Sequence, residues 1–229
     1  MLSAPLAAGF VLLTAALAAA FVWGVARAPS ARAAGAALGV VALYLGVSFA
    51  LARAGVLADV DARPPPVGLM LLAMGAGMVA LAFSPLGDRL LAWPLSVLVG
   101  VQAFRIAVEL LLAAVWADGA LPVEMTYHGL NFDVVTGLLA VPLAVWLRSA
   151  PPTPAQRRAV LAWNGLGAAL LAVVVAMASL SAFGVWETRP RVLLPAAWPG
   201  VWLPAWLVML ALLGHVLVFR ALARARRAP

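Results

Sequence analysis

The chain has 229 residues, of which 66% are hydrophobic and 10% are charged, and it contains no cysteine. All fifteen basic residues are arginine, and the net charge is +7. A soluble domain of this length needs a far more charged surface, so the composition excludes that class. The missing cysteines exclude thiolate nucleophiles, disulfides and thiolate metal sites, and the missing lysines exclude a retinal Schiff base. The arginines lie at the ends of apolar segments rather than on one basic face, which excludes nucleic acid as a partner.

Seven apolar segments follow one another along the chain with short connections between them. Each is close to the roughly 20 residues that a helix needs to cross a bilayer, and together they leave no stretch for a separate soluble domain. The sequence therefore predicts an all-α, polytopic transmembrane helix bundle, a single domain over residues 1–229 with the lipid bilayer as its partner. The expected spans are 5–26, 33–52, 67–86, 91–116, 130–147, 159–183 and 201–222.

The first three segments carry few polar residues. Segment 5–26 has no basic residue before it and is longer than the hydrophobic region of a signal peptide, so we expect it to remain in the mature protein. Segment 67–86 follows three consecutive prolines at 64–66 and ends in a tight turn at 84–88.

The arginines are distributed unevenly between the two ends of the predicted spans. With the N-terminus outside, ten arginines flank the inner ends, whereas Arg53, Arg63, Arg189 and Arg191 flank the outer ends. Cytoplasmic loops of membrane proteins carry an excess of arginine and lysine. The sequence therefore predicts an outer N-terminus and an inner C-terminus, which agrees with an odd number of spans.

Tryptophans mark both predicted membrane surfaces. Their amphipathic rings favour the headgroup level, so we interpret them as anchors. Trp23, Trp93, Trp146 and Trp163 fall at predicted inner ends, and Trp116, Trp186, Trp198 and Trp202 at predicted outer ends.

The fourth segment contains Gln102, Arg105 and Glu109, whose spacing of three and then four places them on one helical face. An arginine near the bilayer centre costs at least about 2.5 kcal/mol unless it is compensated. Glu109 is the expected partner, with Asp133 of the next segment also within reach. A buried ion pair that fixes helix packing and an anion-binding or proton-linked site both remain open.

The connection into the fifth segment is the densest polar stretch of the chain. Glu124, His128, Asn131 and Asp133 lie within it, and Thr136 follows on the same helical face as Asp133. Asn131 or Asp133 is expected to cap the helix, and the group is either a solvated outer loop or a site at the outer mouth. If Arg105 meets both carboxylates, one of them would exchange protons.

A third polar group lies towards the inner side, with Trp163 and Asn164 at the start of the sixth segment and His215 in the seventh. His215 is expected to bond between helices, with a proton carrier or ligand contact as alternatives. It lies more than about 20 Å from His128 by helical rise, so the two cannot share a haem or a zinc ion. A metal held by carboxylates alone, at Glu109, Glu124 and Asp133, remains open, and we expect no cofactor.

Several of these residues form a pattern that resembles one in bacterial multi-pass membrane proteins. It consists of Phe104-Arg105, Glu109, Pro122, Met125-Thr126, Gly129, Asn131-Phe132-Asp133 and Gly137, and it continues in Trp163-Asn164 and from Trp202-Leu203-Pro204 to His215. The resemblance covers most of the chain from the fourth segment onward and implies no activity. For a bacterial protein of this class we expect the cytoplasmic (inner) membrane. The predicted topology is also similar to that of rhodopsins, but the missing lysine sets the chain apart.

Three functions fit these patterns. The first is a small-solute or proton-linked transporter with a polar site on the fourth, fifth and seventh segments. The second is an intramembrane enzyme for a lipid or isoprenoid, with Glu109 and Asp133 as acid and base and Arg105 on an anionic head group. The third is a binding, sensory or assembly subunit without chemistry, in which the polar residues are structural. The ligand would be a small molecule or a lipid.

Overall fold

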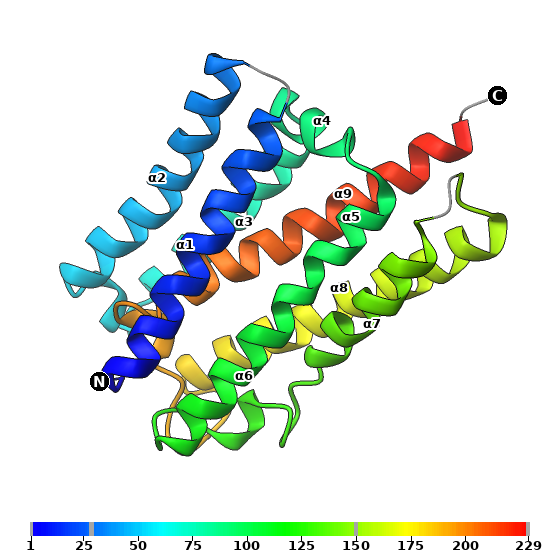
Figure 1. The fold of residues 1–229 in the computed structure, drawn as a ribbon. Coiled ribbons are helices and arrows are strands. Elements are labelled where there is room, and N and C mark those ends of the chain that lie inside the picture. Colours follow the sequence, from blue (N-terminus) through cyan, green and yellow to red (C-terminus); the bar gives the residue numbers. More distant parts are fainter. Residues whose placement is uncertain (1, 28–29, 149–150, 228–229) are drawn as a thin grey trace.

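The computed structural model describes residues 2–27, 30–148 and 151–227, and over these residues the chain is helical and has no strand. Figure 1 shows long helices packed side by side. The α-helices are α1 (Ala4–Ala26), α2 (Ala31–Arg53), α3 (Pro66–Ala82), α4 (Pro85–Leu91), α5 (Leu95–Gly100), α6 (Phe104–Ala117), α7 (Val134–Trp146), α8 (Pro154–Ala182) and α9 (Val208–Arg227). Short turns of 3-10 helix are η1 (Val56–Ala58), η2 (Val101–Ala103), η3 (Val123–Met125) and η4 (Leu194–Ala196), and η5 (Leu203–Leu207) is a π-helical turn. The predicted domain also includes residues 1, 28–29, 149–150 and 228–229, which lie outside the described residues.

Five helical stretches are long and apolar enough to cross a membrane: α1, α2, the joined stretch Leu95–Ala117, α8, and the stretch Leu203–Ala225 that joins η5 to α9. Helices α3 and α4 are bent by 64° at the break between them, and as one span they would be a sixth. Helix α7 has only 13 residues and falls short of that length. The chain is therefore an integral membrane protein built as an all-α bundle, as the sequence predicts, while length and composition support five or six spans.

Several helix boundaries differ from the prediction, and three of them have a clear local reason. Helix α8 begins at Pro154 instead of 159, because the side chains of Thr153 and Gln156 each accept a backbone N–H of the other in a capping box. The third segment breaks after Ala82, because Ser84 caps the separate helix α4. Helix α7 begins at Val134 instead of 130, because the preceding residues form turns.

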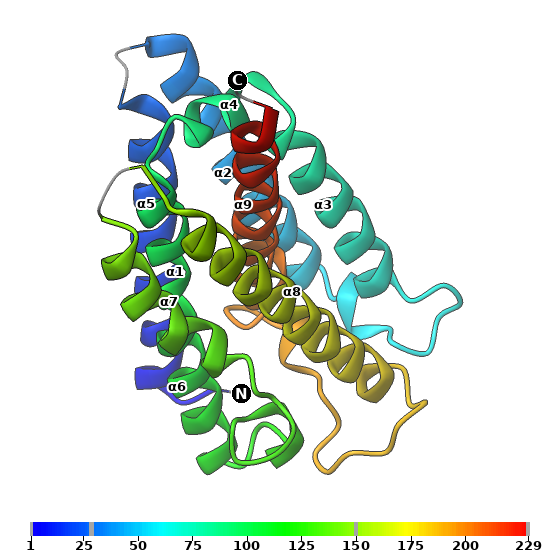
Figure 2. The same cartoon turned by 90° about the vertical axis from the view of Figure 1, so that its right-hand side faces the viewer.

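Helix α9 runs through the middle of the bundle, where it packs against α3, α5 and α8 (Figure 2). In its apolar stretch 61% of the residues are buried by protein, compared with 17% in α2. A helix surrounded by other helices can carry polar groups that lipid would not tolerate. The surroundings of α9 are therefore the part of the bundle suited to a polar site.

The largest apolar core lies at the side of the bundle that α1, α2, α3 and η5 share. Trp206 of η5 is fully buried there and meets the rings of Phe21 and Tyr44 edge to face, at centroid distances of 5.6 and 6.0 Å. The Tyr44 hydroxyl donates to the carbonyl oxygen of Met74 at 2.7 Å, which ties α2 to α3. This part of the bundle is filled by apolar and aromatic side chains, and the buried charged side chains of the described residues, Arg105, Glu109 and Asp133, lie outside it.

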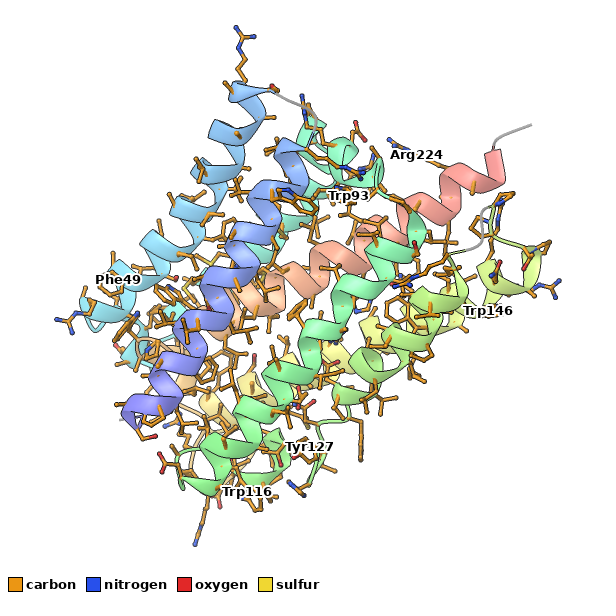
Figure 3. The ribbon with its side chains drawn as sticks, in the orientation of Figure 1. Phe49, Trp93, Trp116, Tyr127, Trp146 and Arg224 are labelled. Carbon is orange, nitrogen blue, oxygen red and sulfur yellow. The ribbon has the colours of Figure 1, made fainter. Side chains whose placement is uncertain are left out.

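The tryptophans divide into exposed and buried sets. Trp23, Trp116, Trp146 and Trp198 are exposed, and Figure 3 shows Trp93 and Trp146 towards one end of the bundle and Trp116 towards the other. Trp163 is only 5% exposed, so its interpretation as a surface anchor is wrong. The earlier start of α8 places it ten residues into the helix, among its neighbours.

Candidate functional site

Arg105 of α6 lies at the centre of a buried polar network between α6, α7, α8 and α9. Its Nε donates to Oδ2 of Asp133 at 2.7 Å and its Nη2 donates to Oδ1, so the guanidinium binds the carboxylate with two bonds. A third bond runs from Nη2 to the carbonyl oxygen of Gly167 in α8, at 3.4 Å. Both charged side chains are buried, and a buried pair of this geometry is stabilised by its hydrogen bonds as well as by its charge.

The remaining guanidinium nitrogen of Arg105, Nη1, contacts His215 of α9. Arg105 Nη1 lies 2.6 Å from His215 Nε2, and because a guanidinium has only donors, Nε2 is the acceptor. The proton of this imidazole therefore sits on Nδ1, which donates to Oδ1 of Asn164 at 2.8 Å. The Asn164 amide nitrogen donates back to the His215 carbonyl oxygen at 3.1 Å. His215 thus connects helices, as the sequence analysis expects, and α8 fixes its tautomer.

Glu109 stands one turn along α6 but does not pair with Arg105, which corrects the expected partnership. Both Glu109 carboxylate oxygens accept from Asn131 Nδ2, at 3.0 and 2.8 Å, and the same nitrogen donates to the Met125 carbonyl oxygen. A glutamate placed after its cation on a helix pairs less well than one placed before it. Asp133, from another segment, meets the guanidinium instead.

The chain reaches this network through a folded, non-helical segment between α6 and α7. The turn is tight at Gly129, where a Cβ would overlap the backbone of Val123 and Glu124. Asn131 Oδ1 accepts the backbone N–H of Asp133 at 3.1 Å and so stabilises the turn before α7, but it makes no hydrogen bond to the first turn of the helix, so the expected cap is wrong for Asn131. The Asp133 carboxylate makes no cap, because it is turned towards Arg105.

Two glycines let the helices approach the arginine closely. A Cβ on Gly167 would lie 2.6 Å from both His215 Cε1 and Thr136 Cγ2. A Cβ on Gly137 would lie 2.9 Å from Ile106 Cγ1 and 3.4 Å from Arg105 Cβ. Both sites therefore need glycine. Gly167 is not among the ten candidate residues, although a glycine in a polar helix face is a signal of close packing.

Thr136 and Gln102 border the network and each keeps a buried oxygen without a hydrogen-bond partner. The Thr136 backbone oxygen accepts from Trp163 Nε1 at 3.0 Å, which ties α7 to α8 and adds a residue absent from the predicted site. Gln102 Nε2 donates to the Ala211 carbonyl oxygen of α9 at 3.3 Å. Each of these two side-chain oxygens, Thr136 Oγ1 and Gln102 Oε1, can accept a hydrogen bond next to the ion pair.

Glu124 and His128 lie apart from the network. His128 is exposed, and its ring contacts those of Trp116 and Tyr127 in a tilted arrangement, at centroid distances of 5.1 and 4.4 Å. Figure 3 shows Trp116 and Tyr127 together at that end of the molecule. Among the ten predicted residues, the structure therefore gathers Gln102, Arg105, Glu109, Asn131, Asp133, Thr136, Asn164 and His215, and leaves these two outside.

A metal held by carboxylates finds no support in the described part of the chain, where no three His, Asp or Glu side chains are grouped to hold an ion. Asp133 is engaged by Arg105 and Glu109 by Asn131, while Glu124 lies in the loop. The arrangement offers two carboxylates, one fixed cation and one imidazole of defined tautomer. These are groups that can move protons or bind a small anion.

Comparisons with protein-family models, with curated proteins and with solved structures each find no match to this chain. The side chains at the site are therefore the basis for any functional assignment.

Proposed function

We propose that this integral membrane protein is a proton-linked transporter for a small solute, with Glu109 as its proton-carrying group. The observation that carries the proposal is the presence of two buried carboxylates beside a single guanidinium. Arg105 and Asp133 neutralise each other, whereas Glu109 receives hydrogen bonds only from a neutral amide. An isolated charge is costly away from water, so a proton on Glu109 completes the charge balance, and its release changes that balance.

Interrupted helices around the network also support transport. The 3-10 turn η2 directly precedes the helix that carries Arg105, and the π-helical turn η5 directly precedes α9. Helix α7 has 13 residues, and the non-helical segment before it brings Asn131 and Asp133 into the bundle. Broken helices at polar sites are common in transporters, since their free backbone groups and flexible joints serve both binding and opening.

We also propose seven crossings, with the N-terminus outside and the C-terminus inside, in the cytoplasmic membrane of a bacterium. The two ends of the chain lie at opposite ends of the bundle (Figures 1 and 2), in agreement with an odd number of crossings. Described arginines gather at the end where α9 finishes, and there Arg220 and Arg224 both bind Asp88. The positive-inside rule makes that end cytoplasmic.

The lipid enzyme is less well supported than the transporter. It needs a lateral opening that leads from lipid to the acid and base. The apolar groove on the bundle surface is lined by α1, α4–α6 and α9, and none of the ten candidate residues lines it. Acyl or isoprenoid chains in that groove would not touch Glu109 or Asp133.

Cysteine accessibility tests the transport proposal without knowledge of the solute, because the chain is naturally free of cysteine. Thr136→Cys places a thiol in the network at a position whose hydroxyl has no partner. A transporter alternates the exposure of its site, so a membrane-impermeant methanethiosulfonate should label this thiol from one side. Between acidic and alkaline medium, the labelled side should change, or the labelling rate should change relative to that of an always-exposed cysteine at the same pH, because the reactive thiolate fraction of any cysteine rises with pH.

Two control variants show how an accessible cysteine and a lipid-facing cysteine are labelled. Ala117→Cys, at the exposed end of α6, should react from one side at every pH. Leu138→Cys lies on the exposed apolar face of α7 and should stay unlabelled, because lipid disfavours the thiolate. If Thr136→Cys stays unlabelled from both sides while Ala117→Cys reacts, the network is a closed structural element and the transport proposal is wrong.

A further inference from the structure

An apolar groove of about 170 Å³ lies on the bundle surface, and no residue of the polar network lines it. Its floor is formed by buried side chains of three regions, among them Phe21 of α1, Leu98 of α5 and Leu213 of α9. Its rim includes Trp23, Val97 and Val101, which are exposed. The groove is therefore concave and apolar, and its exposed rim faces the lipid that surrounds the bundle.

The groove matches one lipid chain in length and position. Along α1 its lining extends from Leu17 to Gly24, which is about 10 Å by helical rise. One leaflet contributes about 15 Å of hydrocarbon, so the groove follows most of the depth of a leaflet. Its Leu90 and Trp93 end lies near the arginine-rich end of the bundle, which the proposed topology places in the cytoplasm.

A cation is held at that end of the groove. The guanidinium of Arg27 lies over the Trp93 ring at 4.2 Å, and the Trp93 indole N–H donates to the Gly24 carbonyl oxygen at 3.0 Å. Figure 3 shows Trp93 beside the end of α1. Asp88 is the acidic residue nearest in sequence to Leu90 and Trp93. It is already bound by Arg220 and Arg224. The charge on Arg27 is thus positioned and has no ion-pair partner among the described residues.

We propose that the groove is a binding site for an anionic phospholipid, with one acyl chain along the groove and the phosphate at Arg27. Apolar lining suits the chain, and a positioned arginine at the cytoplasmic level suits an acidic head group. The proposal does not depend on transport, because the groove and the polar network share no residue. It names a ligand class for a surface that the polar site leaves unused.

Native mass spectrometry of the purified, delipidated protein tests the site directly. Phosphatidylglycerol and phosphatidylcholine with identical acyl chains are added separately, and bound lipids per protein are counted. We expect phosphatidylglycerol to bind about fivefold more tightly, which corresponds to one arginine near the head group. Arg27→Gln should abolish this preference, whereas Arg53→Gln, at the other end of α2, should leave it unchanged.

Filling the groove tests the acyl chain separately. Ala20→Trp occupies the groove from the exposed rim of α1, and Ala19→Trp is its matched control outside the lining. Val97→Trp fills the groove from the opposite wall, so the test survives if one variant fails to fold. Both groove variants should reduce binding of the first lipid of either kind. Undiminished binding in both, or a preference that persists in Arg27→Gln, would overturn the proposal.

Discussion

The guanidinium of Arg105 donates two hydrogen bonds to the carboxylate of Asp133, which lies 28 residues further along the chain. Glu109, one turn along the same helix, receives its hydrogen bonds from Asn131 instead. The arginine therefore joins α6 to the start of α7, and the glutamate remains available for a separate chemical role.

The Arg105–Asp133 pair predicts a large difference between single and double substitutions. Asp133→Leu leaves a buried cation without its partner and Arg105→Met leaves a buried anion, so each single variant should destabilise the protein by about 3–5 kcal/mol. The double variant Arg105→Met with Asp133→Leu removes both charges and should recover most of that loss. Equilibrium unfolding in mixed detergent micelles measures the free energy of unfolding of the single and double variants. A double variant as unstable as the sum of its single variants would show that the two side chains do not act as a pair.

Glu109→Gln separates proton chemistry from folding. The amide keeps the size of the carboxylate and can still accept from Asn131, so we expect stability to change by only about 1 kcal/mol. Proton movement into proteoliposomes, driven by a potassium diffusion potential and read by a trapped pH-sensitive dye, should be lost. Glu124→Gln is the matched control, because that carboxylate lies outside the network. Equal proton movement in wild type and Glu109→Gln would exclude Glu109 as the proton carrier.

The apolar segments made the helices predictable, because periodicity and length are enough to recognise them in a membrane protein. The start of α8 was also present in the sequence, since Thr153 and Gln156 with Pro154 between them have the spacing of a capping box. The break between α3 and α4 was visible as a turn, but the size of its 64° bend was not.

The partners inside the network were not predictable from spacing. Sequence spacing places Arg105 and Glu109 on one face, but a helical face does not determine which side chain of another segment arrives there. Asp133 has the position and residue type of a helix cap, and its contact with a cation 28 residues away overrides that local preference. Trp163 looked like an anchor only because α8 was expected to begin later.

The structure predicts which tautomer His215 adopts, and NMR spectroscopy can test it. Arg105 donates to Nε2 and Asn164 accepts from Nδ1, so the neutral imidazole should carry its proton on Nδ1. Nitrogen-15 NMR of the histidine side chains in lipid distinguishes the two ring nitrogens, and His215→Gln identifies the signal. Asn164→Ala should shift this signal, because the acceptor for Nδ1–H is removed. A proton on Nε2 would contradict the contact with the guanidinium.

Gly167 and Gly165 of α8 should respond in opposite directions to the same substitution. A Cβ at Gly167 would press on His215 and Thr136 at 2.6 Å, so Gly167→Ala should destabilise the protein by about 1–3 kcal/mol and weaken activity through the displaced histidine. A Cβ at Gly165 meets nothing within 4 Å, so Gly165→Ala should stabilise the helix by about 0.5–1 kcal/mol. Thermal unfolding of the two variants in one detergent compares them directly. If both are stabilised alike, α8 does not pack against His215 as closely as the structure shows, and the network is looser than its hydrogen bonds indicate.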